Sequence, residues 1–352
     1  MRRILLWPTL LASALLTSVA GAATPTRGYV VSHFIPAMYN VSDSECPNGM
    51  NEDTTKLLER VLKQQGKSDD EIKAAANADT LDMYRFSQFM TMRGKADGKA
   101  VDVYLHPLSS TETLQLAVST QALGFNLDGK TGPDKFTDPL TKETGVNNQM
   151  ARILGCYTQM RGTPETRASS QGVGGIAAWL IAVDGAENLQ NADNVTVHIY
   201  RALQSMTRGT RGIQANVTYT VDTTDPRMQN NAYQGRIKDG LFVSDKPIDF
   251  FMVTSQGYDD LKQSRLRISF KPDGTVLGFL GGFDSIKMLY VKKTQMRGLG
   301  EFDGQNFPAF FQTMLKLADT DIDKDSQTGT RTRISATYQL GGIPAFLRFP
   351  GK

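Results

Sequence analysis

Apolar residues at every second position recur in short segments after residue 95. Residues 195–199, 217–221, 266–270 and 334–340 all follow this pattern. A period of two puts alternate side chains on opposite faces of a β-strand, so each segment has one apolar and one polar face. Such strands are typical of antiparallel sheets that bury one face and expose the other. The pattern therefore predicts a mainly β, antiparallel body over residues 96–352.

One β-hairpin is predicted within this body. Residues 266–270 lead into Lys-Pro-Asp-Gly-Thr at 271–275, and an apolar run follows at 276–280. Asp-Gly between two apolar runs favours a tight turn, because glycine adopts a positive φ without steric penalty. We expect the two flanking runs to pair as antiparallel neighbours.

Helical spacing is found mainly before residue 95. Residues 57–62 place four apolar side chains on one helical face, Ser68 and Glu71 match a capping box, and residues 81–92 repeat the helical spacing. A late helix is predicted from Pro308, because proline suits the first turn of a helix. Strands and long helices do not alternate, which argues against a doubly wound parallel sheet.

These patterns together predict an α+β fold that is mainly β. We expect an antiparallel β-sandwich-like body, an N-terminal helical segment over residues 23–95 that packs on it, and one late C-terminal helix. Residues 28–31 are predicted as an edge strand.

The first 22 residues are typical of a cleavable signal peptide. Arg2 and Arg3 precede an apolar run to residue 19, and Ala-Gly-Ala at 20–22 is a small-residue cleavage signal. A retained membrane anchor is the alternative, but the run is short for a spanning helix. No later run has the length of a membrane span. We therefore predict a periplasmic or secreted protein without a transmembrane segment after cleavage.

The chain contains two cysteines, Cys46 and Cys156. An oxidising compartment favours a disulfide between them, and two buried free thiols are the alternative.

The balance of charge argues against one class of partner. The chain has 39 Lys and Arg residues against 36 Asp and Glu residues. No basic excess is present to neutralise phosphates, so we expect no nucleic-acid partner.

An acidic run near the C-terminus is the sharpest candidate site. Asp319, Asp321, Asp323 and Asp325 occupy every second position, and hard oxygen ligands of this kind suit Ca²⁺. The run lacks the glycine and the final glutamate of an EF-hand loop. Calcium binding is therefore one interpretation, and a solvated acidic loop is the other.

A second polar loop spans residues 124–149. Asn126, Asp128, Asn147 and Asn148 could supply further oxygen ligands. Ordinary turn chemistry is the alternative, because Asn, Asp and Gly favour turns for backbone reasons.

No catalytic motif is found in the chain. His33, His106 and His198 are far apart and fit no zinc-binding spacing. Ser170 lacks the strand–turn–helix context of a nucleophile elbow. The catalytic residues of any enzyme activity therefore stay unassigned.

Several segments carry a resemblance to known sequences. They are residues 124–129, 145–149 with 154–156, 273–275 with 281–283, and a stretch from Leu315 through Thr328 and Gly329 to residues 344–346. They resemble a group of exported bacterial proteins that has no assigned activity. The resemblance implies an extracytoplasmic protein with one shared architecture and supplies no catalytic residues.

The leading hypothesis is an exported binding or structural protein of unknown ligand, with Ca²⁺ as a candidate stabilising ion. The alternative is an exported hydrolase that acts on a polymer or an ester through carboxylates that the sequence does not single out. A third hypothesis is an accessory subunit of an exported complex. A hydrolase predicts a cleft with convergent acids of disturbed pKa, whereas a binding protein predicts a groove without them.

Overall fold

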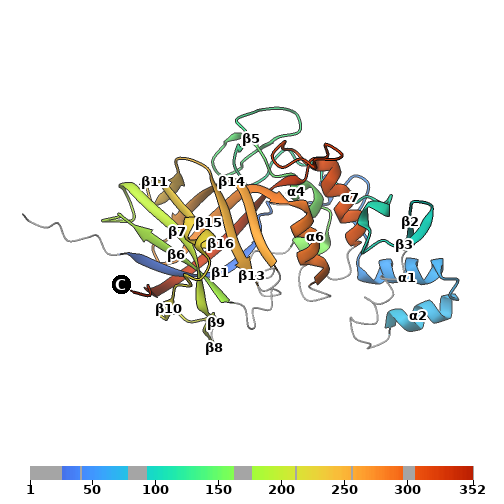
Figure 1. Ribbon diagram of the computed structural model, residues 1–352, viewed down its shortest axis with the longest axis horizontal. Helices are drawn as coiled ribbons and strands as arrows, with labels where there is room; N and C mark the ends of the chain where they lie inside the picture. The colour runs from blue at the N-terminus through green and yellow to red at the C-terminus, as the bar shows by residue number, and fades with distance from the viewer. Residues whose placement is uncertain are drawn as a thin grey trace, which may run out of the picture.

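The central element of the protein is a closed antiparallel sheet (Figure 1). The computed structural model describes residues 26–39, 42–77, 93–161, 177–210, 212–254, 257–295 and 306–351. Within these residues, eight strands follow one another around the sheet in chain order: β1 (Arg27–Pro36), β6 (Ala177–Asp184), β7 (Ala192–Ser205), β11 (Ala232–Lys238), β12 (Leu241–Ser244), β14 (Gly257–Phe270), β15 (Val276–Ser285) and β16 (Arg333–Arg348). Because β1 pairs with both β6 and β16, the sheet closes into a barrel.

The closed sheet confirms a mainly β fold but corrects the prediction of a sandwich. The residues predicted as an edge strand lie in β1, where Tyr29 faces Ile181 of β6 on one side and Pro344 of β16 on the other. β1 also comes from the segment predicted as helical, so that segment contributes one wall of the barrel. Alternation specifies which side chains point inward, but it does not specify which strand pairs with the first one.

Apolar side chains fill the inside of the barrel. Ile181, Val197, Phe242, Leu266 and Leu280 come from five different strands, and all are fully buried. They belong to one continuous core that extends to the helices at one end of the barrel. An eight-stranded barrel is just wide enough for side chains to fill it. The barrel is therefore a packed scaffold.

The predicted hairpin is confirmed between β14 and β15. Phe270 pairs with Val276, and the amide of Lys271 donates to the carbonyl of Thr275. Gly274 has a φ of +83°, which is the left-handed conformation that glycine adopts most easily. The side chain of Asp273 accepts a hydrogen bond from the amide of Thr275 at 2.9 Å and completes the turn.

The helices within the described residues are α1 (Thr54–Gln64), α2 (Asp69–Asn77), α4 (Gln149–Leu154), α6 (Ile286–Gln295) and α7 (Phe307–Leu317). The predicted capping box is confirmed at α2, where the amide of Ser68 donates to the Glu71 carboxylate and the amide of Glu71 donates to the Ser68 hydroxyl. The late helix is confirmed as α7, with Pro308 in its first turn. The helix predicted at 81–92 lies outside the described residues. In the described part of the chain, no helix has the length and apolar character needed to cross a membrane.

Short elements complete the fold. The strands are β2 (Arg93–Ala96), β3 (Lys99–Asp102), β4 (Phe136–Thr137), β5 (Thr144–Val146), β8 (Arg208–Gly209), β9 (Gly212–Ile213), β10 (Thr218–Thr220) and β13 (Ile248–Thr254). The 3₁₀ helices are η1 (Asp43–Glu45), η2 (Pro107–Ser109), η3 (Thr158–Arg161) and η4 (Pro226–Asn230).

The two ends of the barrel differ in their connections. Short connections after β6, β11 and β14 lie at one end. The long connections after β1, β12 and β15 lie at the other end, where α4, α6 and α7 gather, whereas β8, β9 and β10 in the connection after β7 lie beside the end of β16 (Figure 1). Candidate sites are therefore expected at this second end, because loops held by a rigid scaffold carry most binding residues.

Candidate functional site

A disulfide fastens the long connection between β1 and β6. Cys46 and Cys156 are bonded, with their Cα atoms 5.7 Å apart, which confirms the predicted pairing. Cys46 follows η1 and Cys156 lies just after α4, so the bond holds η1 beside α4. The amide of Asn51 also donates to the carbonyl of Cys156 at 2.8 Å. These two parts of the connection are therefore rigidly joined.

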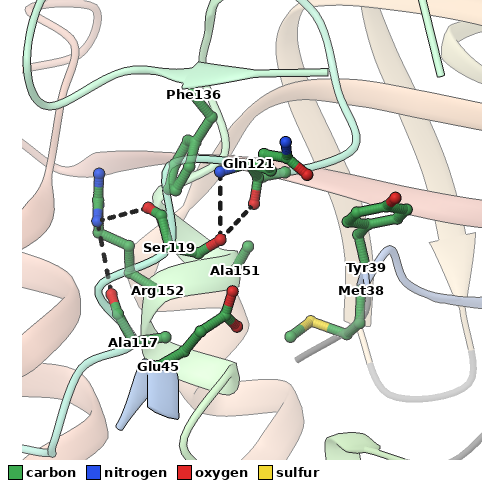
Figure 2. Close-up of a pocket in the computed structure, with 10 residues that line it drawn as sticks. Met38, Tyr39, Glu45, Ala117, Ser119, Gln121, Phe136, Ala151 and Arg152 are labelled. Atoms are coloured by element: carbon green, nitrogen blue, oxygen red, sulfur yellow. Dashed lines mark hydrogen bonds between the residues drawn. The ribbon is translucent and has the colours of Figure 1, made fainter. Parts of the chain in front are cut away.

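A small pocket lies beside this disulfide (Figure 2). Its wall comes from the chain after β1, from η1, from residues 117–122, from β4 and from α4. Met38, Ala117, Phe136 and Ala151 provide much of its apolar surface. The free space is about 10 Å³, which is room for about one water molecule. The pocket can therefore receive a single small group, such as the tip of a longer ligand.

Glu45 is the acidic residue of the pocket lining, and Arg152 is its basic residue. Its Oε2 atom is buried and accepts no hydrogen bond, and its side chain lies in the wall of the pocket (Figure 2). The backbone of Glu45 is fixed, because its amide donates to Ser42 and its carbonyl accepts from Val118 at 2.9 Å. An unsatisfied buried polar group costs about 1–3 kcal/mol. The fold therefore holds a carboxylate oxygen ready to accept a hydrogen bond.

Arg152 lines the same pocket but has other partners. Its guanidinium donates to the carbonyls of Ala117 and Ser119 at 3.5 and 3.3 Å, and to that of Asp134 at 3.4 Å. It also lies 4.3 Å from the centroid of the Phe136 ring, within the range of a cation–π contact. Burial lowers the pKa of Arg152 from its ordinary value. Arg152 thus supports the pocket wall, whereas Oε2 of Glu45 remains available to accept a hydrogen bond from a ligand.

The two polar loops predicted as candidate sites meet in the structure. The side-chain amide of Asn147 donates to Asp319 at 3.3 Å, across 172 positions of sequence. Asp319 also accepts from the amide and the hydroxyl of Ser335, at 2.8 and 2.7 Å. Burial raises the pKa of Asp319, and these hydrogen bonds offset only part of the effect. The meeting point therefore joins both loops to the outer wall of the barrel.

The other aspartates of the acidic run bind protein groups. Asp321 pairs with Arg331 at 2.8 Å and with Lys324 at 3.1 Å. Asp323 pairs with Arg333, and Asp325 accepts from the amides of residues 327 and 328. Among the described residues, no group of three His, Cys, Asp or Glu side chains is placed to hold a metal ion. Calcium binding stays a prediction, and the contacts favour a loop held by ion pairs.

The remaining polar-loop residues also have structural partners. Asn126 donates to the carbonyl of Thr144 at 3.2 Å, and Asp128 pairs with Lys135 at 2.9 Å. Asn148 accepts from the amide of Ala151 and so caps α4. The alternative interpretation of this loop, ordinary turn and capping chemistry, describes these contacts best.

A second set of charged groups lies where the barrel meets α6. Lys292 of α6 contacts Asp259 of β14, and both side chains are almost fully enclosed. Asp284 of β15 is completely buried and accepts from the hydroxyl of Tyr338 at 2.6 Å. Burial raises the pKa of Asp284 above its ordinary value. None of these four residues lines the pocket of Figure 2.

The sequence reasoning missed both of these sites. Glu45 directly precedes Cys46, and this adjacency to a predicted disulfide was the one available signal. Asp259, Asp284 and Lys292 belong to three different elements and show no spacing that would group them.

A scan against protein-family models found no match, and searches of the curated proteins and of the solved structures found no match either. The geometry of the described residues must therefore carry any functional conclusion.

Proposed function

We propose that the protein is an exported binding protein. The closed barrel is its scaffold, and the pocket beside Cys46 and Cys156 is its binding site. Two features support export: residues 1–22 have the pattern of a signal peptide, and disulfides persist in oxidising compartments. The resemblance to exported bacterial proteins points the same way.

One observation carries the assignment of the site. The buried Oε2 of Glu45 has no hydrogen-bond partner, although the disulfide and two backbone hydrogen bonds fix the residue in place. A preorganised acceptor of this kind loses little entropy when it binds a ligand. A ligand that donates to this oxygen also removes the free-energy cost of a buried, unsatisfied acceptor. Carboxylates that are exposed to water carry no such cost.

The ligand class follows from the charge and size of the pocket. A carboxylate oxygen accepts hydrogen bonds, so the ligand must donate one. The free space of about 10 Å³ limits the inserted group to about the size of a water molecule. An ammonium group has this size, and charge-assisted hydrogen bonds are about twice as strong as neutral ones. Met38 and Ala151 offer apolar surface to an alkyl stem. The proposed ligand therefore carries a primary ammonium group on an alkyl chain.

The hydrolase hypothesis is less well supported. Two buried carboxyl groups have raised pKa values, Asp284 and Asp319, and neither lines the pocket. Asp319 is occupied by Ser335 and Asn147, and Asp284 by Tyr338. A general acid must reach its substrate within hydrogen-bond distance. These contacts favour binding over hydrolysis.

Calorimetric titration of the protein with n-butylammonium chloride tests the proposal. We expect saturable binding to the unmodified protein and a loss of about tenfold or more in affinity in Glu45→Gln, because a hydrogen bond to a charged group contributes about 1.5–3 kcal/mol. Glu59→Gln is the matched control, since Glu59 is an exposed glutamate of α1 in the same connection. Equal affinity in all three proteins, or no binding to any, would refute the proposed site.

A further inference from the structure

Lys292 is an unusual lysine because its whole side chain is enclosed. It projects from α6, and only 10% of the side chain is exposed. Its Nζ contacts Oδ1 of Asp259 on β14, a carboxylate that is 11% exposed. Gly257 packs close to the alkyl part, since a Cβ at Gly257 would lie 3.9 Å from Cγ of Lys292. The amine and the carboxyl carbon of Asp259 are thus held together away from water.

Asp284 completes this cluster. It faces Leu261 across the β14–β15 pair, so Asp259, two positions before Leu261, lies diagonally opposite on the same face of the sheet. The carboxyl of Asp284 is fully buried and accepts from Tyr338 at 2.6 Å and from the amide of Ser285 at 2.8 Å. Burial raises its pKa, the charge of Lys292 lowers it and that of Asp259 raises it, with a net increase. Burial thus disfavours the charged form of Asp284, although Tyr338 and Ser285 each donate to one of its two oxygens.

We infer that Lys292 and Asp259 join in a covalent amide bond, with Asp284 as the residue that relays protons during its formation. The bond would link α6 to β14 across the end of the barrel, between residues 33 positions apart in the chain.

The reaction balances without an outside reagent. The ammonium of Lys292 gives one proton to the Asp259 carboxylate, which leaves a neutral amine beside a neutral carboxylic acid. The amine lone pair attacks Cγ of Asp259, and a C–N bond forms. Asp284 gives its proton to the departing hydroxyl and takes one from the nitrogen. The C–O bond breaks, one water molecule leaves, and Asp284 ends as it began.

Two features of the surroundings favour this reaction. Burial alone would lower the pKa of Lys292, but the charges of Asp259 and Asp284 outweigh it and raise the pKa, so the ammonium must first give its proton to Asp259 within the pair. Fixed contact between amine and carboxyl replaces a bimolecular encounter, and well-oriented groups reach effective molarities of about 10⁵ M or more. Enclosure also limits the return of water that would hydrolyse the product.

Mass spectrometry of the purified full chain, after reduction of its disulfide, tests the inference directly. We expect a mass lower by one water molecule than that calculated from the observed N-terminus. We also expect a branched tryptic peptide that joins the segments around Asp259 and Lys292. The exposed pair of Lys262 and Asp249, with nitrogen and oxygen 3.1 Å apart, is the internal control and should yield only linear peptides. A full mass with linear peptides throughout would overturn the inference and leave an ordinary buried ion pair.

Two conservative variants test the assigned roles. Asp259→Asn should still form the bond but release ammonia instead of water, which gives a distinct mass difference and identifies the acceptor. Asp284→Asn keeps the shape of the side chain but cannot relay protons, so the chain should fold with the native circular dichroism spectrum and keep its full mass. Complete bond formation in Asp284→Asn would refute the relay. If that variant does not fold, the mass of the unmodified chain and of Asp259→Asn still decides whether the bond forms.

Discussion

Asp138 and Arg267 form an ion pair of 2.8 Å between the outer wall of the barrel and the loop that covers it. Their side chains are 0% and 6% exposed, so both charges are removed from water. Asp138 also accepts from the amides of Gly124, Leu140 and Thr141. Burial alone would raise the pKa of Asp138, but Arg267 and the amides outweigh it and hold the pKa below its ordinary value. The pair therefore joins the covering loop to the barrel.

Asp138→Ala should destabilise the protein strongly. Removing one partner leaves the guanidinium of Arg267 buried without its counter-charge, which lowers the free energy of unfolding by about 3–5 kcal/mol. Urea unfolding followed by circular dichroism measures the change. Asp245→Ala is the control, because Asp245 pairs with Arg236 at 3.6 Å on the exposed surface and should cost at most about 1 kcal/mol. Equal decreases in the free energy of unfolding in both variants would show that the buried Asp138–Arg267 pair stabilises the protein no more than an exposed pair.

The raised pKa of Asp319 predicts a pH dependence of stability. The folded state binds this proton more tightly than the unfolded chain does, because burial disfavours the charged carboxylate. The stability that this tighter proton binding contributes is fully present below the ordinary pKa of about 3.9. It is lost as the pH rises through the pKa of Asp319 in the folded state. Asp319→Asn cannot ionise, so the stability of the variant relative to the unmodified protein should increase over this rise in pH. Unfolding free energies measured across that range test this, and a constant difference would contradict it.

Calcium should leave the melting temperature unchanged. Asp321 and Asp323 are each neutralised by arginine, and Asp325 is bound by backbone amides of its own turn. An ion that bound only the folded state would raise the melting temperature by mass action. Melts in Ca²⁺ and in EDTA should therefore coincide. A rise of several degrees in Ca²⁺ that disappears in Asp321→Ala with Asp323→Ala would instead establish the calcium site that the acidic run predicts.

Loss of the disulfide should destabilise the protein by about 2–5 kcal/mol and weaken binding at the pocket. The bond closes a separation of 110 residues and holds η1, which carries Glu45, beside α4. The double variant Cys46→Ser with Cys156→Ser can be compared with the unmodified protein by urea unfolding and by titration with n-butylammonium chloride. Unchanged affinity would show that the disulfide does not preorganise Glu45.

Local sequence signals predicted the local structure well. Alternation located a part of each of β7, β14 and β16, Asp-Gly located the β14–β15 turn, and Pro308 marked the start of α7. Closure of the barrel could not be predicted in the same way. It depends on pairs such as Phe34 with Leu340, which lie far apart in the chain and have no local signal.

The candidate sites also differ in whether a local sequence signal marks them. The cysteine count and the predicted export indicated the disulfide correctly, because few alternatives exist for two cysteines. The acidic run and the polar loop were recognised as unusual, and the structure joins them through Asn147 and Asp319. Their contacts favour a structural role. The sequence did not indicate Glu45 as a site residue, because a missing hydrogen bond can be recognised only in the folded chain.

The most direct test of the proposed binding site is methyl NMR of protein labelled at its methionines, during titration with n-butylammonium chloride. Met38 lines the pocket, whereas Met228 and Met252 lie in the core away from it. We predict that the Met38 methyl signal shifts in a saturable manner, that the Met228 and Met252 signals stay in place, and that Glu45→Gln abolishes the shift. A Met38 signal that does not move at saturating ligand, or that moves equally in Glu45→Gln, would contradict the proposed function.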